Sequence, residues 1–404
     1  MSIAAAVQTR LARTTGLRCP RLDYRLLGVV LCLLALGLVM VTSASVSMAD
    51  RQFGQPFYYG LRQAVYLLVG LGAAALVFGI RMAHWARAGV PVLLLALGLL
   101  AVVLVPGVGN TVNGATRWIA LGPVNLQVSE PAKLLLLIYL AGYLVRHGEE
   151  VRSKVSGFIK PMAVLIVAAA LLLAEPDFGA TVVLFATALA MMFLAGVRWW
   201  QFGTLIGGSG LALAILAVSS PYRMTRLTTF IDPWKDPFDS GFQLTQSLIA
   251  IGRGHWFGVG LGSGVQKLFY LPEAHTDFVF AVFAEEFGLV GVVLLLALYG
   301  FLVWRAFAIG SVAEKAGDRF SGYLAYGIGT WLALQSAINI GVNMGLLPTK
   351  GLTLPLLSYG GSSLVVMCVA FGLLLRIDYE TRCSVHTLPA NTPLPQRRAP
   401  RRPV

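Results

Sequence analysis

The sequence predicts an all-α, polytopic membrane protein of about ten transmembrane helices, with a long outer loop between spans 7 and 8. Composition is the first reason, because 57% of the 404 residues are hydrophobic and only 12% are charged, too little polar surface for a soluble domain. Apolar runs near the ~20 residues that cross a bilayer recur along the chain. These runs are continuously apolar, whereas a membrane barrel would alternate polar and apolar residues.

The predicted spans follow a basic N-terminal arm, residues 1–25, which has no cleavage site. The first span, LGVVLCLLALGLVMVTSASV, therefore serves as its own insertion signal. After the membrane domain, 26–376, a Pro- and Arg-rich tail at 377–404 is expected to be disordered. We place the spans at 26–48, 61–80, 89–106, 130–146, 161–175, 178–197, 202–219, 277–304, 320–345 and 361–376.

Basic residues set the predicted orientation. A net charge of +13 can accompany nucleic-acid binding, but here the basic residues are scattered in small groups between apolar runs. The two terminal segments and alternate short loops hold 21 of the 31 Lys and Arg residues, which places both termini in the cytoplasm. Cys19 and Cys383 fall in the tails, and Cys32 and Cys368 in spans, so the oxidising outer face has no thiol to pair.

One connection, 220–276, is long and lies on the predicted outer face, which favours a functional role. It contains FQLTQSLIAIG, a predicted short helix at the membrane surface. Its end, YLPEAHTD, brings Glu273, His275 and Asp277 together where the eighth span begins. Asp277 at this position is explained either as a helix cap or as a carboxylate that accepts a proton from a bound hydroxyl.

Charged side chains within or beside spans are a second clue, because burying one costs at least ~2.5 kcal/mol. The pairs are Glu130 and Lys133, Glu175 and Asp177, and Glu285 and Glu286. For each pair, ion pairing that only fixes helix packing explains the charged residues as well as a functional role does. A Lys133 that pairs with Asp177 or Asp277 would serve both structure and function.

The ninth span carries a polar stripe. Gln335, Asn339 and Asn343 recur every four residues on one helix face, as interhelical hydrogen bonding or a polar cavity wall would require. The following segment, MGLLPTKGLTLPLLSYGGSS, predicts an irregular or re-entrant outer loop, and it contains Lys350 and Ser358.

Two arginines in the long loop are candidate phosphate ligands. Arg223 and Arg226 have the i, i+3 spacing of neighbours on one helix face. Their guanidinium groups suit the oxygens of a lipid diphosphate. Snorkelling to ordinary lipid phosphate is the alternative.

Six segments, in order and across most of the membrane domain, resemble one known family. They are NGATRWI at 113–119, SEPAKL at 129–134, EPDFGAT at 175–181, DPFDSGFQLTQSLIAIG at 236–252, LPEAHTDFVFAVFAEEFG at 271–288 and LLPTKGLTLPLLSYGGSS at 346–363. In these segments the chain resembles the SEDS family of shape, elongation, division and sporulation proteins, most closely its cell-division branch. One departure is Gly254–His255, where many members have two glycines.

The resemblance implies a peptidoglycan glycosyltransferase that polymerises lipid II at the outer surface of the cytoplasmic membrane, at the division septum. It implies as partners a class B penicillin-binding protein, other divisome membrane proteins and membrane lipids. Asp277 matches the family's essential loop aspartate and would act as general base in an inverting displacement. The leaving diphosphate would need Lys133, Arg223 or Lys350, or a divalent cation such as Mg²⁺ or Mn²⁺, for which the sequence contains no recognisable site. Further candidate substrate contacts are Asp177, Arg226, Glu273, His275 and Ser358.

Two other functions are compatible with the composition. A lipid II flippase or another transporter would also need polar residues inside a multi-span bundle, and a non-catalytic division scaffold would need only the spans and tails. The polar residues concentrate in the outer half of the predicted spans, and no acidic chain reaches the inner face. That placement favours a reaction at the outer surface of the membrane over transport across the membrane.

Overall fold

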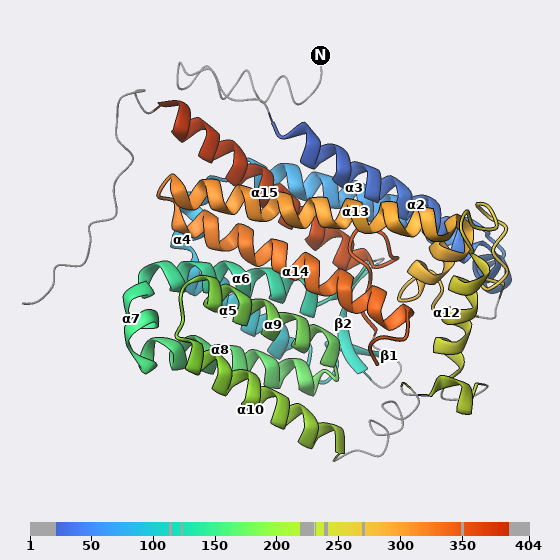
Figure 1. The fold of residues 1–404 in the computed structure, drawn as a ribbon, viewed down its shortest axis with the longest axis horizontal. Helices are drawn as coiled ribbons and strands as arrows, with labels where there is room; N and C mark the ends of the chain where they lie inside the picture. The colour runs from blue at the N-terminus through green and yellow to red at the C-terminus, as the bar shows by residue number, and fades with distance from the viewer. Residues whose placement is uncertain are drawn as a thin grey trace, which may run out of the picture.

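Each predicted span coincides with a helix of the computed structural model, which confirms the all-α fold class (Figure 1). The structure describes residues 22–112, 115–122, 124–218, 230, 232–237, 241–268, 271–348 and 351–387. The long helices are α2 (Tyr24–Phe53), α3 (Tyr58–Phe78), α5 (Gly89–Val102), α6 (Ser129–Arg146), α8 (Val155–Ala174), α9 (Phe178–Leu194), α10 (Trp199–Val218), α13 (Val279–Lys315), α14 (Arg319–Asn343) and α15 (Gly361–Thr387).

Two ends of this bundle are distinguished by what lies there. We call the end where α2 begins and α15 ends the terminal end; α4 (Met82–Arg87) and α7 (Gly148–Ser153) lie there too (Figure 1). The opposite end, where α13 begins and α14 ends, is the loop end. It carries α12 (Phe242–Arg253), which is the predicted FQLTQSLIAIG helix, and the 3-10 turn Pro233–Lys235.

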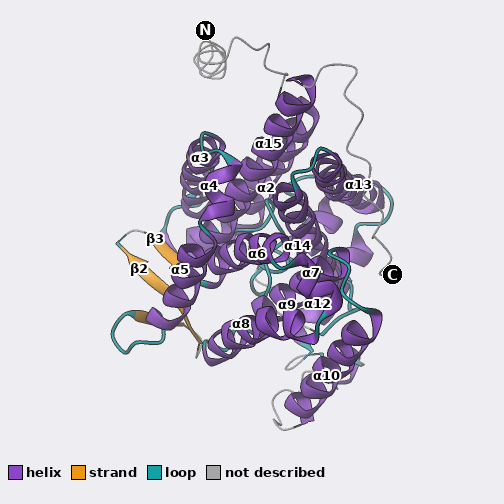
Figure 2. Cartoon of the chain, turned by 90° about the vertical axis from the view of Figure 1, so that its left-hand side faces the viewer, coloured by secondary structure: helices purple, strands orange, loops and turns teal. Residues whose placement is uncertain are grey.

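Lipid contact explains the outer surface of the bundle. Five of the described helices are long and apolar enough to cross a membrane, and α5 and α9 are shorter apolar helices. Leu61, Leu68 and Leu76 follow one face of α3 and are more than half exposed, as expected for side chains that face hydrocarbon. The helices α6 and α14 lie in the middle of the bundle, and α10 lies at its periphery (Figure 2).

The segment between α5 and α6 forms a small sheet that the sequence analysis did not predict. Strands β1 (Gly109–Val112), β2 (Ala115–Leu121) and β3 (Val124–Gln127) make an antiparallel meander in the order β1-β2-β3. Gly122, with φ of +70°, turns the chain between β2 and β3. The β-branched and aromatic residues of ATRWIAL suit a half-buried strand, but the run is too short to stand out in a search for spans.

Helix α13 is broken near its start, within the predicted eighth span. Gly288 has φ of +66° and ψ of −167°, which no continuous helix allows. Residues 254–260 fill the break: the amides of Val259 and Gly260 donate to the carbonyls of Glu285 and Glu286 over 3.0 and 3.1 Å. The backbone groups that the kink frees are thus satisfied by the neighbouring loop.

The segment before α15 is irregular, as predicted, and runs through the interior of the bundle. Leu354, Leu356 and Leu357 are almost fully buried. Gly37 of α2 permits the approach, because a side chain there would meet the carbonyl oxygen of Leu356. Polar side chains satisfy the buried carbonyls, among them that of Pro355, which accepts a hydrogen bond of 2.6 Å from the hydroxyl of Tyr299.

The last helix extends further than predicted. The sequence predicts that the tenth span ends at 376 and that the tail begins there, but α15 continues to Thr387. Two i, i+4 ion pairs stabilise these extra turns, Arg376 with Glu380 at 2.6 Å and Arg382 with Asp378 at 2.9 Å. The Pro- and Arg-rich composition predicts a disordered tail because composition does not show which charges pair.

Candidate functional site

Three segments that are distant in sequence meet at the loop end. They are the 175–177 turn before α9, the 271–278 turn before α13 and the 351–360 segment before α15. The amide of Tyr359 donates to the carbonyl of His275 over 2.9 Å, and Asn339 of α14 donates both to Asp277 and to Leu352. Strand β2 lies beside the first of these turns, because its Arg117 donates to the carbonyls of Glu175 and Pro176.

Asp277 is held by its backbone. Its carbonyl oxygen accepts hydrogen bonds from the amide groups of Asn339 and Asn343, over 2.9 and 3.0 Å. Asn343 also accepts from the amide of Ala281 over 3.2 Å, which fixes the first turn of α13. The polar stripe of α14 therefore hydrogen-bonds to irregular backbone. Its spacing suggested either hydrogen bonds between helices or the wall of a polar cavity.

The carboxylate of Asp277 does not cap a helix. The N-cap of α13 is Phe278, and no side chain caps this helix. The carboxylate is half-buried and lies beside Gly351, where an added Cβ would come within 3.1 Å of its Oδ2 atom. Of the two explanations that the sequence left open, the structure removes the cap.

Burial raises the pKa of Asp277 to about 7, and the negative charges of Glu273 and Asp177 act in the same direction. The positive charge of Arg117 on β2 lowers it. A carboxylate with such a pKa changes protonation state near neutral pH, which is the property required of a general base that takes up and releases a proton.

The turn at Glu175 and Asp177 is tied to the sheet. Arg117 donates from Nε to the carbonyl of Glu175 over 3.1 Å and from Nη2 to the carbonyl of Pro176, whose φ is +33°. Asp177 caps α9 by accepting from the amide of Ala180 over 3.1 Å. Its other oxygen accepts from the hydroxyl of Ser129 over 2.9 Å.

Glu175 is fully buried, and among the described residues neither of its carboxylate oxygens has a hydrogen-bond partner. Burial and the charge of Asp177 raise its pKa to about 8, against the opposing effect of Arg117. The carboxyl group of Glu175 is therefore shifted toward its neutral, protonated form near pH 7.

Lys133 does not pair with Asp177 or Asp277. Its Nζ lies 2.8 Å from Glu130 and 3.2 Å from the Oε1 of Gln335, over the ring of Trp331. It is 1% exposed, so the charge of this lysine is balanced inside the bundle.

The remaining candidates have different surroundings. Glu273 is exposed, with φ of +56°, and accepts from the hydroxyl of Thr276 over 2.7 Å. His275 is buried against the rings of Tyr59 and Tyr359, and this burial lowers its pKa.

Ser358 is buried and accepts from the amide of Leu354 over 2.8 Å. Arg223, Arg226 and Lys350 lie outside the described residues.

Glu285 and Glu286 hold the broken part of α13. Glu285 accepts from the amides of Val265 and Gln266 over 3.0 and 3.2 Å. Glu286 forms an ion pair of 2.5 Å with Lys267 and accepts from the hydroxyl of Ser43. These two carboxylates therefore fix the packing of α13 against the neighbouring loop, which is the structural explanation that the sequence offered for the pair.

Arg117 is the residue that sequence reasoning missed. It belongs to NGATRWI, a motif that carried the resemblance, but nothing in a linear sequence showed that β2 would bring it to the 175–177 turn. Among the described residues, no group of three or more His, Cys, Asp or Glu is arranged to hold a metal ion.

Comparison with known proteins decides the family. A family model described as "Cell cycle protein", for FtsW, RodA and SpoVE, matches residues 24–383. The chain belongs to the FtsW/RodA/SpoVE family. It is 61% identical over 375 residues, 93% of this chain and 92% of the relative, to "Probable peptidoglycan glycosyltransferase FtsW" of Thioalkalivibrio sulfidiphilus. The FtsW of Legionella pneumophila, which has the same name, is 56% identical over 89% of this chain and 91% of that protein.

Solved structures of this family have the same fold. A chain from a peptidoglycan synthase complex, described as coordinating polymerization and crosslinking, is 34% identical and covers 89% of this chain and 98% of its own length, with a TM-score of 0.73. RodA of Thermus thermophilus is 31% identical over 88% of this chain and 96% of its own length, with a TM-score of 0.65. The family assignment and the multi-pass membrane fold thus rest on both sequence and structure.

Proposed function

We propose that this chain is a peptidoglycan glycosyltransferase of the division branch, which polymerises lipid II into β-1,4-linked glycan strands for the septal cell wall. The observation that carries the proposal is the carboxylate of Asp277, anchored through its backbone by α14 and poised to titrate near neutral pH. The names of the FtsW relatives support the activity. The orientation predicted from Lys and Arg would place the loop end outside the cytoplasmic membrane and both termini inside.

Asp277 has a definite task in this reaction. The acceptor's 4-hydroxyl is a poor nucleophile, and a positioned carboxylate that removes its proton contributes ~10²–10⁴-fold to the rate. The hydroxyl oxygen forms a bond to the anomeric carbon of the donor while the bond from that carbon to the diphosphate breaks. Attack from the opposite face converts the α-linked donor to a β-linked product in one displacement.

Arg117 is the cation that we assign to the leaving diphosphate. It is the positive charge that acts on Asp277, whereas Lys133 is balanced by Glu130 within the bundle. A guanidinium group offers five N–H donors, and the carbonyls of Glu175 and Pro176 occupy only some of them. The charge that develops on the diphosphate oxygens would therefore meet a fixed positive charge.

We further propose a class B penicillin-binding protein as the partner that supplies transpeptidase activity. Support comes from the peptidoglycan synthase complex that contains a chain of this fold and that is described as coordinating polymerization and crosslinking. Other divisome membrane proteins remain a prediction from the resemblance.

The test is polymerisation of purified lipid II by the reconstituted chain and its transpeptidase partner. Asp277→Asn should lower turnover at least ~10²-fold, because the amide cannot accept the proton. Glu150→Gln is the matched control, since it neutralises an exposed carboxylate at the terminal end and should leave turnover unchanged.

Wild-type turnover by Asp277→Asn, with equal amounts of folded protein, would contradict the assignment. A liposome assay for headgroup translocation separates the rival function: a flippase would move lipid II across the bilayer without the partner, whether or not polymer forms.

A further inference from the structure

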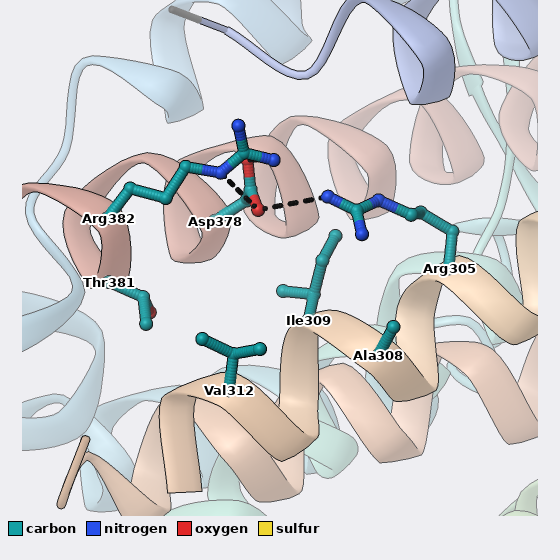
Figure 3. Close-up of a pocket in the computed structure, with 7 residues that line it drawn as sticks. All are labelled: Arg305, Ala308, Ile309, Val312, Asp378, Thr381 and Arg382. Carbon is teal, nitrogen blue, oxygen red and sulfur yellow. Dashed lines mark hydrogen bonds and ion pairs between the residues drawn. The ribbon is translucent and has the colours of Figure 1, made fainter. Parts of the chain in front are cut away.

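A cavity of about 210 Å³ lies between α13 and α15 at the terminal end (Figure 3). It is about 40 Å along α13 from the start of that helix, so the proposed reaction at Asp277 does not use it. Residues of α13 form one wall, α15 forms the other, and the lining consists of Arg305, Ala308, Ile309, Val312, Asp378, Thr381 and Arg382.

The charges at this cavity are layered. Arg305 donates from Nη2 to Asp378 over 3.4 Å and from Nε to Asp23, and Arg382 lies 2.9 Å from Asp378. The two arginine side chains are 21% and 35% exposed, whereas the side chains of Asp23 and Asp378 are 5% and 9% exposed. The carboxylates are therefore buried beneath the guanidinium groups, and the accessible part of the cluster is cationic.

Donors remain available on both arginines. The hydrogen bonds and ion pairs within this cluster use Nε and Nη2 of Arg305 and of Arg382, and a guanidinium group has five N–H donors. Arginine presents these donors in a planar fork that matches phosphate oxygens. Thr381, which also lines the cavity, adds a hydroxyl group.

The other wall is apolar. Ala308, Ile309 and Val312 face the cavity from α13, and Val312 is 48% exposed at the surface of a helix that crosses the membrane. A phosphate-binding edge thus adjoins hydrocarbon-contacting side chains, which is the combination of chemistries that a phospholipid presents.

We propose that the cavity binds the phosphate-bearing headgroup of a phospholipid from the leaflet at the terminal end. The phosphate oxygens contact Arg305 and Arg382, and an acyl chain follows the apolar side of α13. Because Arg305 also binds Asp23, the bound lipid connects the start of α2 with the ends of α13 and α15.

The test uses the purified full chain, delipidated in detergent and titrated with dioleoylphosphatidylglycerol under native mass spectrometry. Arg382→Gln removes one phosphate ligand, and Val312→Trp fills the cavity while all four charged residues stay. Both variants should need at least tenfold more lipid for the same occupancy. Lys160→Gln is the control, because it removes an exposed basic residue elsewhere at the terminal end, and it should bind as the wild type does.

Two probes identify the chemistry. Dioleoylglycerol, which has the same chains without phosphate, should not be retained. Inorganic phosphate alone should not raise the thermal stability of the wild type to the level that phosphatidylglycerol reaches. Equal retention by the wild type and Val312→Trp, equal retention of the two lipids, or full stabilisation by inorganic phosphate would each overturn the proposal.

Discussion

Two groups of carboxylates, one at each end of the bundle, differ in whether they have ion-pair partners. At the terminal end, the described carboxylates of Asp23, Asp378 and Glu380 all form ion pairs with arginines. At the loop end, Asp277 and Glu175 have no ion pair among the described residues, and burial raises the pKa of each.

This difference separates carboxylates with a structural role from carboxylates that could take part in a reaction. An ion pair favours the charged form of a carboxylate and fixes the elements that it joins, whereas burial without an ion pair favours the neutral form. The second kind is therefore better suited to exchange a proton at neutral pH. Perturbed groups of this kind are enriched at functional sites, which is why the loop end is assigned the reaction.

The largest effect that would sharpen this comparison is expected at Arg117. Arg117→Gln should lower turnover at pH 7 by about 10²-fold, because it removes a positive charge from the site. It should also move the midpoint of the pH–rate profile upward from about 7, since Arg117 lowers the pKa of Asp277. Turnover measured between pH 5.5 and 9 checks both effects.

Two controls separate the charge of Arg117 from its bonds to the 175–177 turn. Arg117→Lys keeps the charge and should keep the midpoint. Arg253→Gln removes a cation that pairs with Glu285 instead, and should leave the profile in place. A midpoint that stays at the wild-type value in Arg117→Gln would show that the residue only anchors the turn.

Neutralising a carboxylate at the terminal end should lower stability and leave turnover unchanged. Glu380→Gln leaves Arg376, which is 5% exposed, without its ion-pair partner and should reduce the free energy of unfolding by about 2 kcal/mol. Turnover per folded molecule should not change. Thermal unfolding in detergent compares the stability of Glu380→Gln with that of Asp277→Asn. A comparable loss of stability in both variants would contradict the proposed difference between the two ends.

Glu175 should make stability depend on pH. Its pKa in the folded protein, about 8, exceeds its ordinary value, so the folded state holds a proton that the unfolded state releases. The free energy of unfolding therefore falls as pH rises toward 8. Glu175→Gln should make this fall shallower, gaining at least about 1 kcal/mol at pH 8.5 and little at pH 5. Parallel pH profiles of the melting temperature in both proteins would argue against it.

The smallest expected effect concerns His255. This residue has φ of +43°, a left-handed conformation that glycine adopts more easily. The departure from the family's two glycines therefore has a cost, and His255→Gly should stabilise the fold by about 0.5–1 kcal/mol. Arg253→Gly, at the last residue of α12, should instead destabilise it, and chemical unfolding of the two variants gives the comparison.

Much of the fold could be predicted because lipid imposes simple requirements on a sequence. Long apolar runs located the helices, and Gly and Pro in LLPTKGLTLPLLSYGGSS located the irregular segment before α15. The break of α13 at Gly288 could not be predicted, because it depends on the insertion of residues 254–260 from another part of the chain. The sheet was missed for a similar reason, since pairing across strands is not visible along one strand.

The site was predicted in part. Glu273, His275 and Asp277 are close in sequence, so their proximity needed no tertiary information. Which cation acts on Asp277 did need it: Lys133 was the natural candidate from the sequence, and the structure pairs it with Glu130. Arg117 reaches the same region through the β2 strand.

The sequence by itself determined where the membrane helices lie and, through the resemblance of its motifs, which aspartate is the candidate general base. Both follow from local properties: apolar length for the helices and the order of residues in a motif for Asp277. The tertiary structure alone decided that Asp277 is not a helix cap, that Asn339 and Asn343 hold it, and that Glu175 is buried without a partner. A pKa and a pairing depend on distances between segments, and those distances exist only after the helices have packed.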